Sequence, residues 1–168
     1  TMGYYNPIYT MGIPDFLDSA QSAGIDGLII PDLPPEEATD LRAMANEKGI
    51  STIFLVAPTS SRERVKSIEK ACSDFVYAVT VTGVTGSGHS FDSQTDDYLA
   101  RLRKQLKKPF VAGFGVSSGE SASRLCRAAD GVVIGSALIK EIESHGRSEA
   151  GLDPVRKLLK SVRDSLDR

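Results

Sequence analysis

The chain has 168 residues, of which 40% are hydrophobic and 25% are charged, and its formal net charge is −2 at pH 7. This balance is typical of a soluble globular protein, and the length predicts one domain spanning residues 1–168. The apolar runs are only as long as strands, which excludes a membrane span, and no Lys/Arg block of the kind that binds nucleic acid is present. We therefore expect neither a membrane nor a nucleic acid among the partners.

Neither cysteine has the sequence context of a redox or metal site. Cys72 and Cys126 lie in amphipathic helical patterns, without a CxxC motif or the spacing of metal ligands. We expect both to be core residues of a reduced, cytoplasmic protein, and we expect no metal. The chain opens on TMGYYNP, which looks like the end of a strand, so we also expect the native N-terminus to be missing.

Short β-branched runs alternate with amphipathic helical patterns along the chain. This alternation is typical of βα units with a parallel sheet. Ile29, Ile53 and Tyr77 are spaced 24 residues apart, and such a regular repeat favours a barrel over a doubly wound sheet. The runs, in chain order, are IDGLIIPD, STIFLVAP, DFVYAVT, PFVAGFG and ADGVVIGS.

Several helix starts are marked by prolines and capping residues. The segment PPEE at 34–37 predicts a helix that begins there and ends at Gly49. Ser60–Glu63 and Ser117–Glu120 each have the Ser-x-x-Glu spacing of a capping box. Asp153 followed by Pro154 predicts the start of the last helix, with the aspartate as its cap.

The two ends of the strands carry different residue types. Asp26, Asp74 and Asp130 precede strands, where an aspartate can bind the local backbone. In a (βα)8 barrel these amino ends stabilise the fold, whereas the active site lies at the carboxyl ends of the strands. We therefore expect the functional residues after the strands, not before them.

Glycine follows each of the last two strands, in GFGVSS at 113–118 and in IGSALIK at 134–140. Glycine allows close approach of the backbone, and a helix N-terminus supplies N–H groups to a phosphate. The loops after the last two strands of such barrels frequently bind phosphate. We predict a phosphate site at Gly115, Gly135 and Ser136, with a further contact from Gly86. The alternative is that these glycines only permit tight turns.

Few titratable side chains are candidates for catalysis. Asp32 follows the strand of LIIPD, and Tyr77 lies inside a strand, so both can face a pocket. We expect His89 and His145 at the surface. The sequence contains no Ser-His-Asp or Cys-His arrangement, so it has more residues suited to binding than to catalysis.

Five segments together resemble the tryptophan synthase alpha subunit family: MGYYNP, GLIIPDLPPEE, YAVTVTGVTG, AGFGVSS and VIGSALIK. The resemblance runs from residue 1 to the final helix. It implies a TIM barrel and a lyase of tryptophan biosynthesis, which cleaves indole-3-glycerol phosphate to indole and glyceraldehyde 3-phosphate by a retro-aldol reaction. It also implies a cytoplasmic alpha2beta2 complex with a beta subunit. No cofactor is expected in this chain, because pyridoxal phosphate would belong to the beta subunit.

The resemblance also implies roles for individual residues. Thr85, in a mobile loop, would support the catalytic carboxylate when the loop closes. Tyr4, Tyr77 and Phe114 would line the indole pocket. Asp32 would lie on the partner-facing side and take part in communication between subunits, so we do not assign it as a general base. The family's phosphate-binding positions coincide with the glycines and the serine proposed above.

One motif of the family has no match in this sequence. The acid/base pair of the family, a glutamate and an aspartate, lies in a segment resembling E-x-G-x-P-x-S-D-P. We therefore expect an incomplete barrel of six parallel strands that lacks the first two βα units and is inactive alone. Its unpaired edge strands predict dimerisation or aggregation. Two alternatives are a non-catalytic module that binds a phosphate or a partner, and another phosphate-binding barrel enzyme such as indole-glycerol-phosphate synthase.

Overall fold

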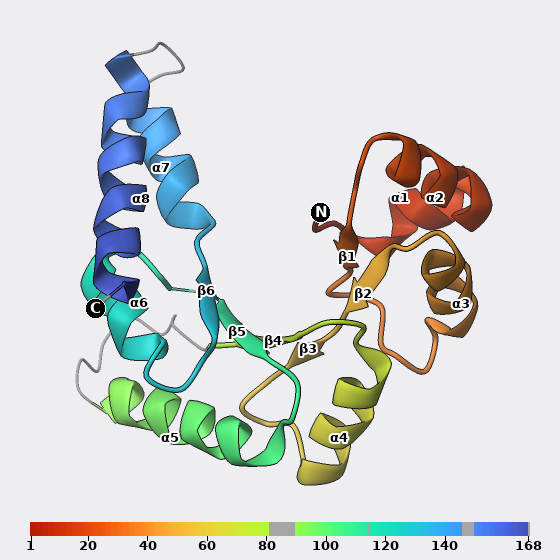
Figure 1. Ribbon diagram of the computed structural model, residues 1–168, viewed down its shortest axis with the longest axis horizontal. Helices are drawn as coiled ribbons and strands as arrows, with labels where there is room; N and C mark the ends of the chain where they lie inside the picture. The colour runs from red at the N-terminus through yellow and green to blue at the C-terminus, as the bar shows by residue number, and fades with distance from the viewer. Residues whose placement is uncertain (81–89, 114, 146–149, 168) are drawn as a thin grey trace. The chain divides into compact units, whose positions relative to one another are not determined.

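The structure is a computed structural model that describes residues 1–80, 90–113, 115–145 and 150–167 (Figure 1). Strands and helices alternate along this part of the chain, as the sequence predicts. The chain divides into two compact units, of which the first contains Thr1–Tyr77 and Leu106–Pro109, and the second Ala78–Gln105 and Phe110–Arg168. The expectation of a single domain over residues 1–168 stays a prediction.

Unit 1 is built from short strands, each connected to the next by helices. Its strands are β1 (Gly27–Ile29), β2 (Ser51–Ile53), β3 (Leu55–Val56) and the first half of β4 (Val76–Val79). Its helices are α1 (Tyr5–Met11), α2 (Ile13–Ser22), α3 (Thr39–Glu47) and α4 (Arg62–Ala71).

The strands of unit 1 pair in the order that the sequence repeat predicts. β1 and β2 are parallel, and Ile29 is the register partner of Ile53. The spacing of 24 residues therefore corresponds to neighbouring positions in the sheet. Met2 forms a parallel bridge with Ile29 on the other edge of β1. Next along the chain, Tyr77 donates its N–H to the carbonyl of Phe54 at 3.1 Å.

Unit 2 continues the same alternation. Its strands are the second half of β4, then β5 (Phe110–Gly113) and β6 (Gly131–Val133). Its helices are α5 (Ser90–Gln105), α6 (Gly119–Leu125), α7 (Ser136–His145), the 3₁₀ helix η1 (Ala150–Leu152) and α8 (Asp153–Leu166). β5 and β6 are parallel, with Gly113 opposite Val133. Thr80, just after β4, donates both its N–H (2.8 Å) and its hydroxyl (2.7 Å) to the carbonyl of Gly113.

The core of each unit is formed by the apolar faces of the helices packed on these strands. In α4, Val65, Ile68 and Ala71 recur at helical spacing and are buried. In unit 2, α6 packs so closely on α8 that a Cβ atom at Gly119 would lie 2.6 Å from the carbonyl oxygen of Ser161. Glycine is therefore required where these helices cross. Figure 1 shows α7 and α8 side by side. Within the described residues, no helix has the length and apolar character needed to cross a bilayer.

The predicted starts of α3 and α8 are displaced in the structure. α3 begins at Thr39 instead of Pro34. Residues 35–37 form a turn because a residue before proline disfavours the helical conformation. The predicted end is confirmed, since Gly49 has a φ of +70° directly after α3. At α8, Asp153 is already the first helical residue and Leu152 takes the cap position.

Both predicted capping boxes lie one residue too early. Ser61, not Ser60, caps α4 and accepts the N–H of Arg64 at 3.2 Å. Ser60 instead accepts the N–H of Ala57 in the preceding turn. In α6 the cap is Ser118, which exchanges hydrogen bonds with Ser121. The first serine of each Ser-Ser pair thus belongs to the turn, and the second begins the helix.

The cysteines are both free, as expected. Cys72 is buried, and its Sγ atom accepts the N–H of Phe54 at 3.2 Å. Burial raises the pKa of the Cys72 thiol, so it stays protonated and unreactive. Cys126 is half-buried, and burial raises its pKa as well. Neither thiol has the depressed pKa of a nucleophile.

Candidate functional site

The predicted phosphate-binding residues of unit 2 lie at one end of a parallel strand pair. Because Gly113 is the register partner of Val133, Gly115 and Gly135 each lie two residues past a matched pair. The two glycines therefore follow neighbouring strands at equivalent positions. Parallel strands have their carboxyl ends at the same edge of a sheet, so these glycines share that edge.

The two glycines are needed for different physical reasons. Gly115 has a φ of +83°, a left-handed conformation that other residues adopt only at a cost. Gly135 is not in that conformation, and a Cβ atom added to it would meet no described atom within 4 Å. Packing against the described residues therefore does not explain a glycine at this position. Among these residues, nothing fills the space beside Gly135.

Ser136 begins α7 directly after Gly135. The first N–H groups of a helix have no acceptor inside it, and they lie at the positive end of the helix dipole. The carbonyl of Gly135 accepts the N–H groups of Leu138 (2.9 Å) and Ile139 (3.2 Å), which tightens the first turn. Ser136 is exposed. This arrangement offers N–H groups and a hydroxyl to an anion.

The predicted indole-pocket residues of unit 1 differ in exposure. Tyr77 in β4 is 3% exposed, and burial raises the pKa of its phenol. It therefore stays protonated at neutral pH and is suited to packing or donating a hydrogen bond, not to acting as a base. Tyr4 is 70% exposed and immediately precedes α1. An exposed aromatic ring is available to pack on a ligand or a partner.

Asp32 also belongs to unit 1, where it contacts the backbone at the start of α1. Its Oδ1 and Oδ2 atoms accept the N–H of Tyr5 at 2.9 Å and 3.2 Å. This contact links the start of α1 to the turn after β1. Sequence reasoning placed Asp32 after its strand correctly but gave no sign of this partner, which lies 27 residues earlier in the chain.

Some predicted residues lie outside the part of the chain that the structure describes. These are Thr85, Gly86, His89 and Phe114. Their assigned roles stay predictions. His145, at the end of α7, is exposed and lies near Glu141 of the same helix, with 3.4 Å between its Nδ1 and Glu141 Oε2. It is a surface residue, as expected.

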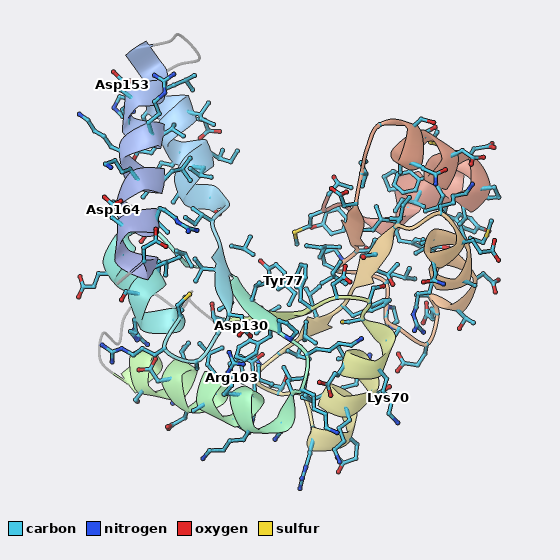
Figure 2. The ribbon with its side chains drawn as sticks, in the orientation of Figure 1. Lys70, Tyr77, Arg103, Asp130, Asp153 and Asp164 are labelled. Atoms are coloured by element: carbon cyan, nitrogen blue, oxygen red, sulfur yellow. The ribbon has the colours of Figure 1, made fainter. Side chains whose placement is uncertain are left out.

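The amino ends of the strands in unit 2 are held by a charged pair, Arg103 and Asp130 (Figure 2). Asp130 accepts the N–H of Phe110 at 2.9 Å, and Arg103 Nη2 lies 2.8 Å from Asp130 Oδ1. Arg103 also donates from Nε to the carbonyl of Ala128 at 2.7 Å. Partial burial alone would raise the pKa of Asp130, but the hydrogen bonds from Arg103 and Phe110 outweigh it and lower that pKa. Asp130 thus binds a backbone N–H at its strand start, but this N–H belongs to Phe110, 20 residues earlier, and not to the local turn that the sequence predicts.

The other two strand-start aspartates act differently. Asp74 accepts a hydrogen bond from the hydroxyl of Ser51, a side chain and not the local backbone. At Asp26 the backbone carbonyl, instead of the carboxylate, accepts the N–H of Ser51 at 2.8 Å. Sequence reasoning missed Glu69, which accepts the N–H of Lys108 at 2.8 Å. No group of acidic, histidine or cysteine side chains suited to a metal occurs among the described residues.

Comparison with known proteins identifies the family. The family model described as tryptophan synthase alpha chain matches residues 1–165. The tryptophan synthase alpha chain of Dehalococcoides mccartyi is 38% identical over 166 residues, which are 99% of this chain and 64% of the relative. That of Geobacter sulfurreducens is 39% identical over 165 residues, which are 98% of this chain and 62% of the relative.

Solved structures show the same similarity in three dimensions. A chain of the tryptophan synthase a2b2 complex from Pyrococcus furiosus aligns with a TM-score of 0.86 at 38% identity, covering 97% of this chain and 65% of its own length. A structure from Aquifex aeolicus aligns with a TM-score of 0.84 at 37% identity, covering 98% and 60%. The expected fold class, an incomplete (βα)8 barrel, is confirmed by this similarity. The chain spans less than two thirds of the length of these relatives. The chain belongs to the tryptophan synthase alpha chain family.

Proposed function

We propose that this chain is part of a lyase that cleaves indole-3-glycerol phosphate to indole and glyceraldehyde 3-phosphate in tryptophan biosynthesis. The observation that supports the proposal is the register of β5 and β6: Gly115 and Gly135 each follow a matched pair of residues by two positions, and Gly135 directly precedes α7. Backbone N–H groups at such a site suit the phosphate of the substrate. Family membership supplies the identity of the substrate that carries this phosphate.

The remaining predicted residues have distinct roles in this proposal. Gly86 adds a phosphate contact, and Ser136 donates its hydroxyl to the same group. Tyr4, Tyr77 and Phe114 contact the indole ring. Thr85 supports a catalytic carboxylate when its loop closes and water is excluded.

The chemistry needs two proton transfers: one from a hydroxyl of the glycerol chain and one to the indole ring. No segment of the 168 residues matches the motif that carries the family's glutamate and aspartate. The residues that are present bind and orient the substrate. We therefore propose that these 168 residues alone bind phosphate esters without turning over the substrate.

The proposal includes a partner and a location. A solved relative is a tryptophan synthase a2b2 complex, and we propose a beta subunit as the partner of this protein. Asp32, which holds the start of α1, is our candidate for communication with it. Proton transfer requires no cofactor in this chain, and pyridoxal phosphate belongs to the beta subunit. The complex is cytoplasmic. Neither a non-catalytic module nor an indole-glycerol-phosphate synthase is favoured, because the family that matches is the alpha chain.

Titration of the isotope-labelled chain with glycerol 3-phosphate, and with glycerol as the uncharged reference, tests the phosphate site. We expect the amide signals of Gly115, Gly135 and Ser136 to move with the ester and not with glycerol. Gly135→Val should lower the affinity for the ester at least about tenfold, because the valine side chain would fill the space beside the start of α7. Gly131→Ala is the matched control at the amino end of the same strand, where the added methyl lies 3.4 Å from Val111. Equal affinity in both variants would contradict the site.

A second assay tests the division between binding and turnover. Release of indole from indole-3-glycerol phosphate is measured with the purified 168-residue chain and with Thr85→Ala. We expect no release above the Thr85→Ala background. Turnover by the unmodified chain would show that an acid/base pair exists among the 168 residues and would overturn that division.

A further inference from the structure

The hydrogen-bond ladder between residues 1–3 and β1 stops at a proline. Ile29 donates its N–H to Thr1 at 2.9 Å, and Gly3 donates its N–H to Ile29 at 3.1 Å. In a parallel ladder the next donor on this side is residue 31, two residues after Ile29. Residue 31 is a proline and has no N–H, so the backbone ladder cannot continue.

The carboxylate of Asp32 continues the connection in place of the backbone. It accepts the N–H of Tyr5 through Oδ1 at 2.9 Å and through Oδ2 at 3.2 Å. Tyr5 is the first residue of α1, so this N–H has no acceptor inside the helix. The local N-cap, Tyr4, makes no side-chain capping bond. The carboxylate of Asp32, in the turn after β1, thus caps α1, and its charge lies at the positive end of the helix.

These bonds hold the backbone on both sides of Tyr4. On one side, Gly3 is bonded to Ile29, and on the other side, Tyr5 is bonded to Asp32. Tyr4 itself is extended, with φ −84° and ψ 155°, and its side chain is 70% exposed. The bonds of Gly3 and Tyr5 therefore hold the backbone of Tyr4, and with it the direction in which the side chain leaves the chain.

We infer that Asp32 is a positioning residue for the aromatic part of the substrate site: by holding the N–H of Tyr5, its carboxylate fixes Tyr4 against the indole ring. This inference rests on the proposed function, which gives Tyr4 its ligand. Asp32 acts through Tyr5 and Tyr4, and it exchanges no proton with the substrate. Its function is to keep an exposed ring at one orientation before the ligand arrives, which lowers the cost of ordering that ring on binding.

The sequence provides a direct way to measure this effect. The chain contains no tryptophan, so the fluorescence of added indole can be followed without a tryptophan background from the protein. Indole and glycerol 3-phosphate are titrated separately into the unmodified chain, Asp32→Ala, Asp32→Asn and Asp15→Ala. Asp15 is the matched control, because it is an acidic residue in the first turn of α2 in the same unit. Hydrogen exchange of the Tyr5 amide is measured in each protein.

For Asp32→Ala we expect faster exchange of the Tyr5 amide and indole binding weakened about three- to tenfold, in line with the loss of a helix cap. Glycerol 3-phosphate binding should not change. Asp32→Asn keeps one acceptor oxygen, so it should restore most of the indole affinity and slow the exchange of Tyr5. Asp15→Ala should change the affinity for neither indole nor glycerol 3-phosphate.

Each failure has a distinct meaning. If the Tyr5 amide exchanges faster in Asp32→Ala while indole affinity is unchanged, Asp32 only caps α1 and the inference is wrong. The same holds if the exchange of Tyr5 does not respond to the substitution. If the unmodified chain binds glycerol 3-phosphate but not indole, the aromatic site and the inference fail while the phosphate site stands. If it binds neither ligand, the proposed function itself fails.

Discussion

The two ends of the strands differ in how their polar groups are paired. At the amino ends, strand N–H groups are bonded to side chains, such as Phe110 to Asp130 and Thr52 to Ser73 at 3.0 Å. At the carboxyl ends, Pro31 has no N–H, Gly115 needs a left-handed backbone, and Gly135 has open space beside it. The comparison teaches that side chains bind strand N–H groups at the amino ends, whereas the carboxyl ends carry prolines and glycines, whose backbones are special in conformation or accessible from solvent.

Removing the large side chain at an amino end should have the largest effect on stability. Phe110 is fully buried, and the Arg103 guanidinium lies 5.0 Å from its ring centroid. We expect Phe110→Ala to lower the free energy of unfolding by about 3–5 kcal/mol in denaturant titrations. Phe110→Leu, which keeps most of the volume, should cost less than about 1.5 kcal/mol. A loss below about 1 kcal/mol for Phe110→Ala would contradict the claim that the amino ends of the strands stabilise the fold.

At the carboxyl ends, the two glycines should respond unequally. Gly115→Ala forces a side chain into a left-handed conformation and should lower the free energy of unfolding by about 1–2 kcal/mol. Gly135→Ala adds a methyl group to open space and should stay within about 0.5 kcal/mol of the unmodified chain. Both are measured by the same denaturant titration. Equal losses would mean that the fold itself requires glycine at position 135, as it does at position 115, so that no ligand is needed to explain it.

The charge of Asp130 should stabilise the fold in a pH-dependent way. Its side chain is 40% exposed, so screening limits the loss in Asp130→Asn to about 1 kcal/mol at pH 7. The pKa of Asp130 is lowered in the folded state, so this stabilisation is complete above its unfolded pKa of about 4. It disappears as the pH falls from there through the lowered folded pKa.

The difference between the unmodified chain and Asp130→Asn should therefore shrink when unfolding is measured at decreasing pH. Arg103→Gln removes the partner of Asp130 and should show the same trend. A difference that stays constant with pH would show that the hydrogen bond to Phe110, and not the charge, carries the effect.

A small loss of stability is expected from removing a helix cap after β5. Ser118 caps α6 and accepts the N–H of Ser121 at 3.2 Å, but it is exposed. Ser118→Ala should therefore lower the free energy of unfolding by about 0.5 kcal/mol, the low end for caps. Ser117→Ala is the matched control and should cost clearly less. If Ser117→Ala were the more costly variant, the helix would begin where the sequence motif alone had placed it.

Patterns that depend on local chemistry were predictable from the sequence. The alternation of strands and helices and the end of α3 near Gly49 followed from periodicity and glycine. The 24-residue repeat was visible in the sequence, and the structure adds that it makes Ile29 and Ile53 register partners. Helix starts were less predictable, because adjacent serines and adjacent prolines offer two positions that differ by little free energy. The Ser-Ser pairs show this, since both caps moved by one residue.

Contacts between distant segments could not be read from the sequence. The bond from Tyr5 to Asp32 joins residues 27 positions apart, and the contact of Gly119 with Ser161 joins α6 to α8. Both depend on how elements pack, which periodicity does not specify. The candidate phosphate glycines were found because glycine after a strand is a local signal. Whether they bind phosphate stays a prediction.

The substitution of a side chain for a backbone group at Pro31–Asp32 has a genetic consequence. The hydrogen bonds of a sheet are normally beyond the reach of point mutation, because every residue carries the same peptide group. Here the acceptor for one backbone N–H is encoded by a single codon, that of Asp32. A single nucleotide change can therefore strengthen, weaken or delete this bond while the peptide backbone stays the same. Variation at this position therefore changes the start of α1 without changing any backbone group of the ladder between residues 1–3 and β1.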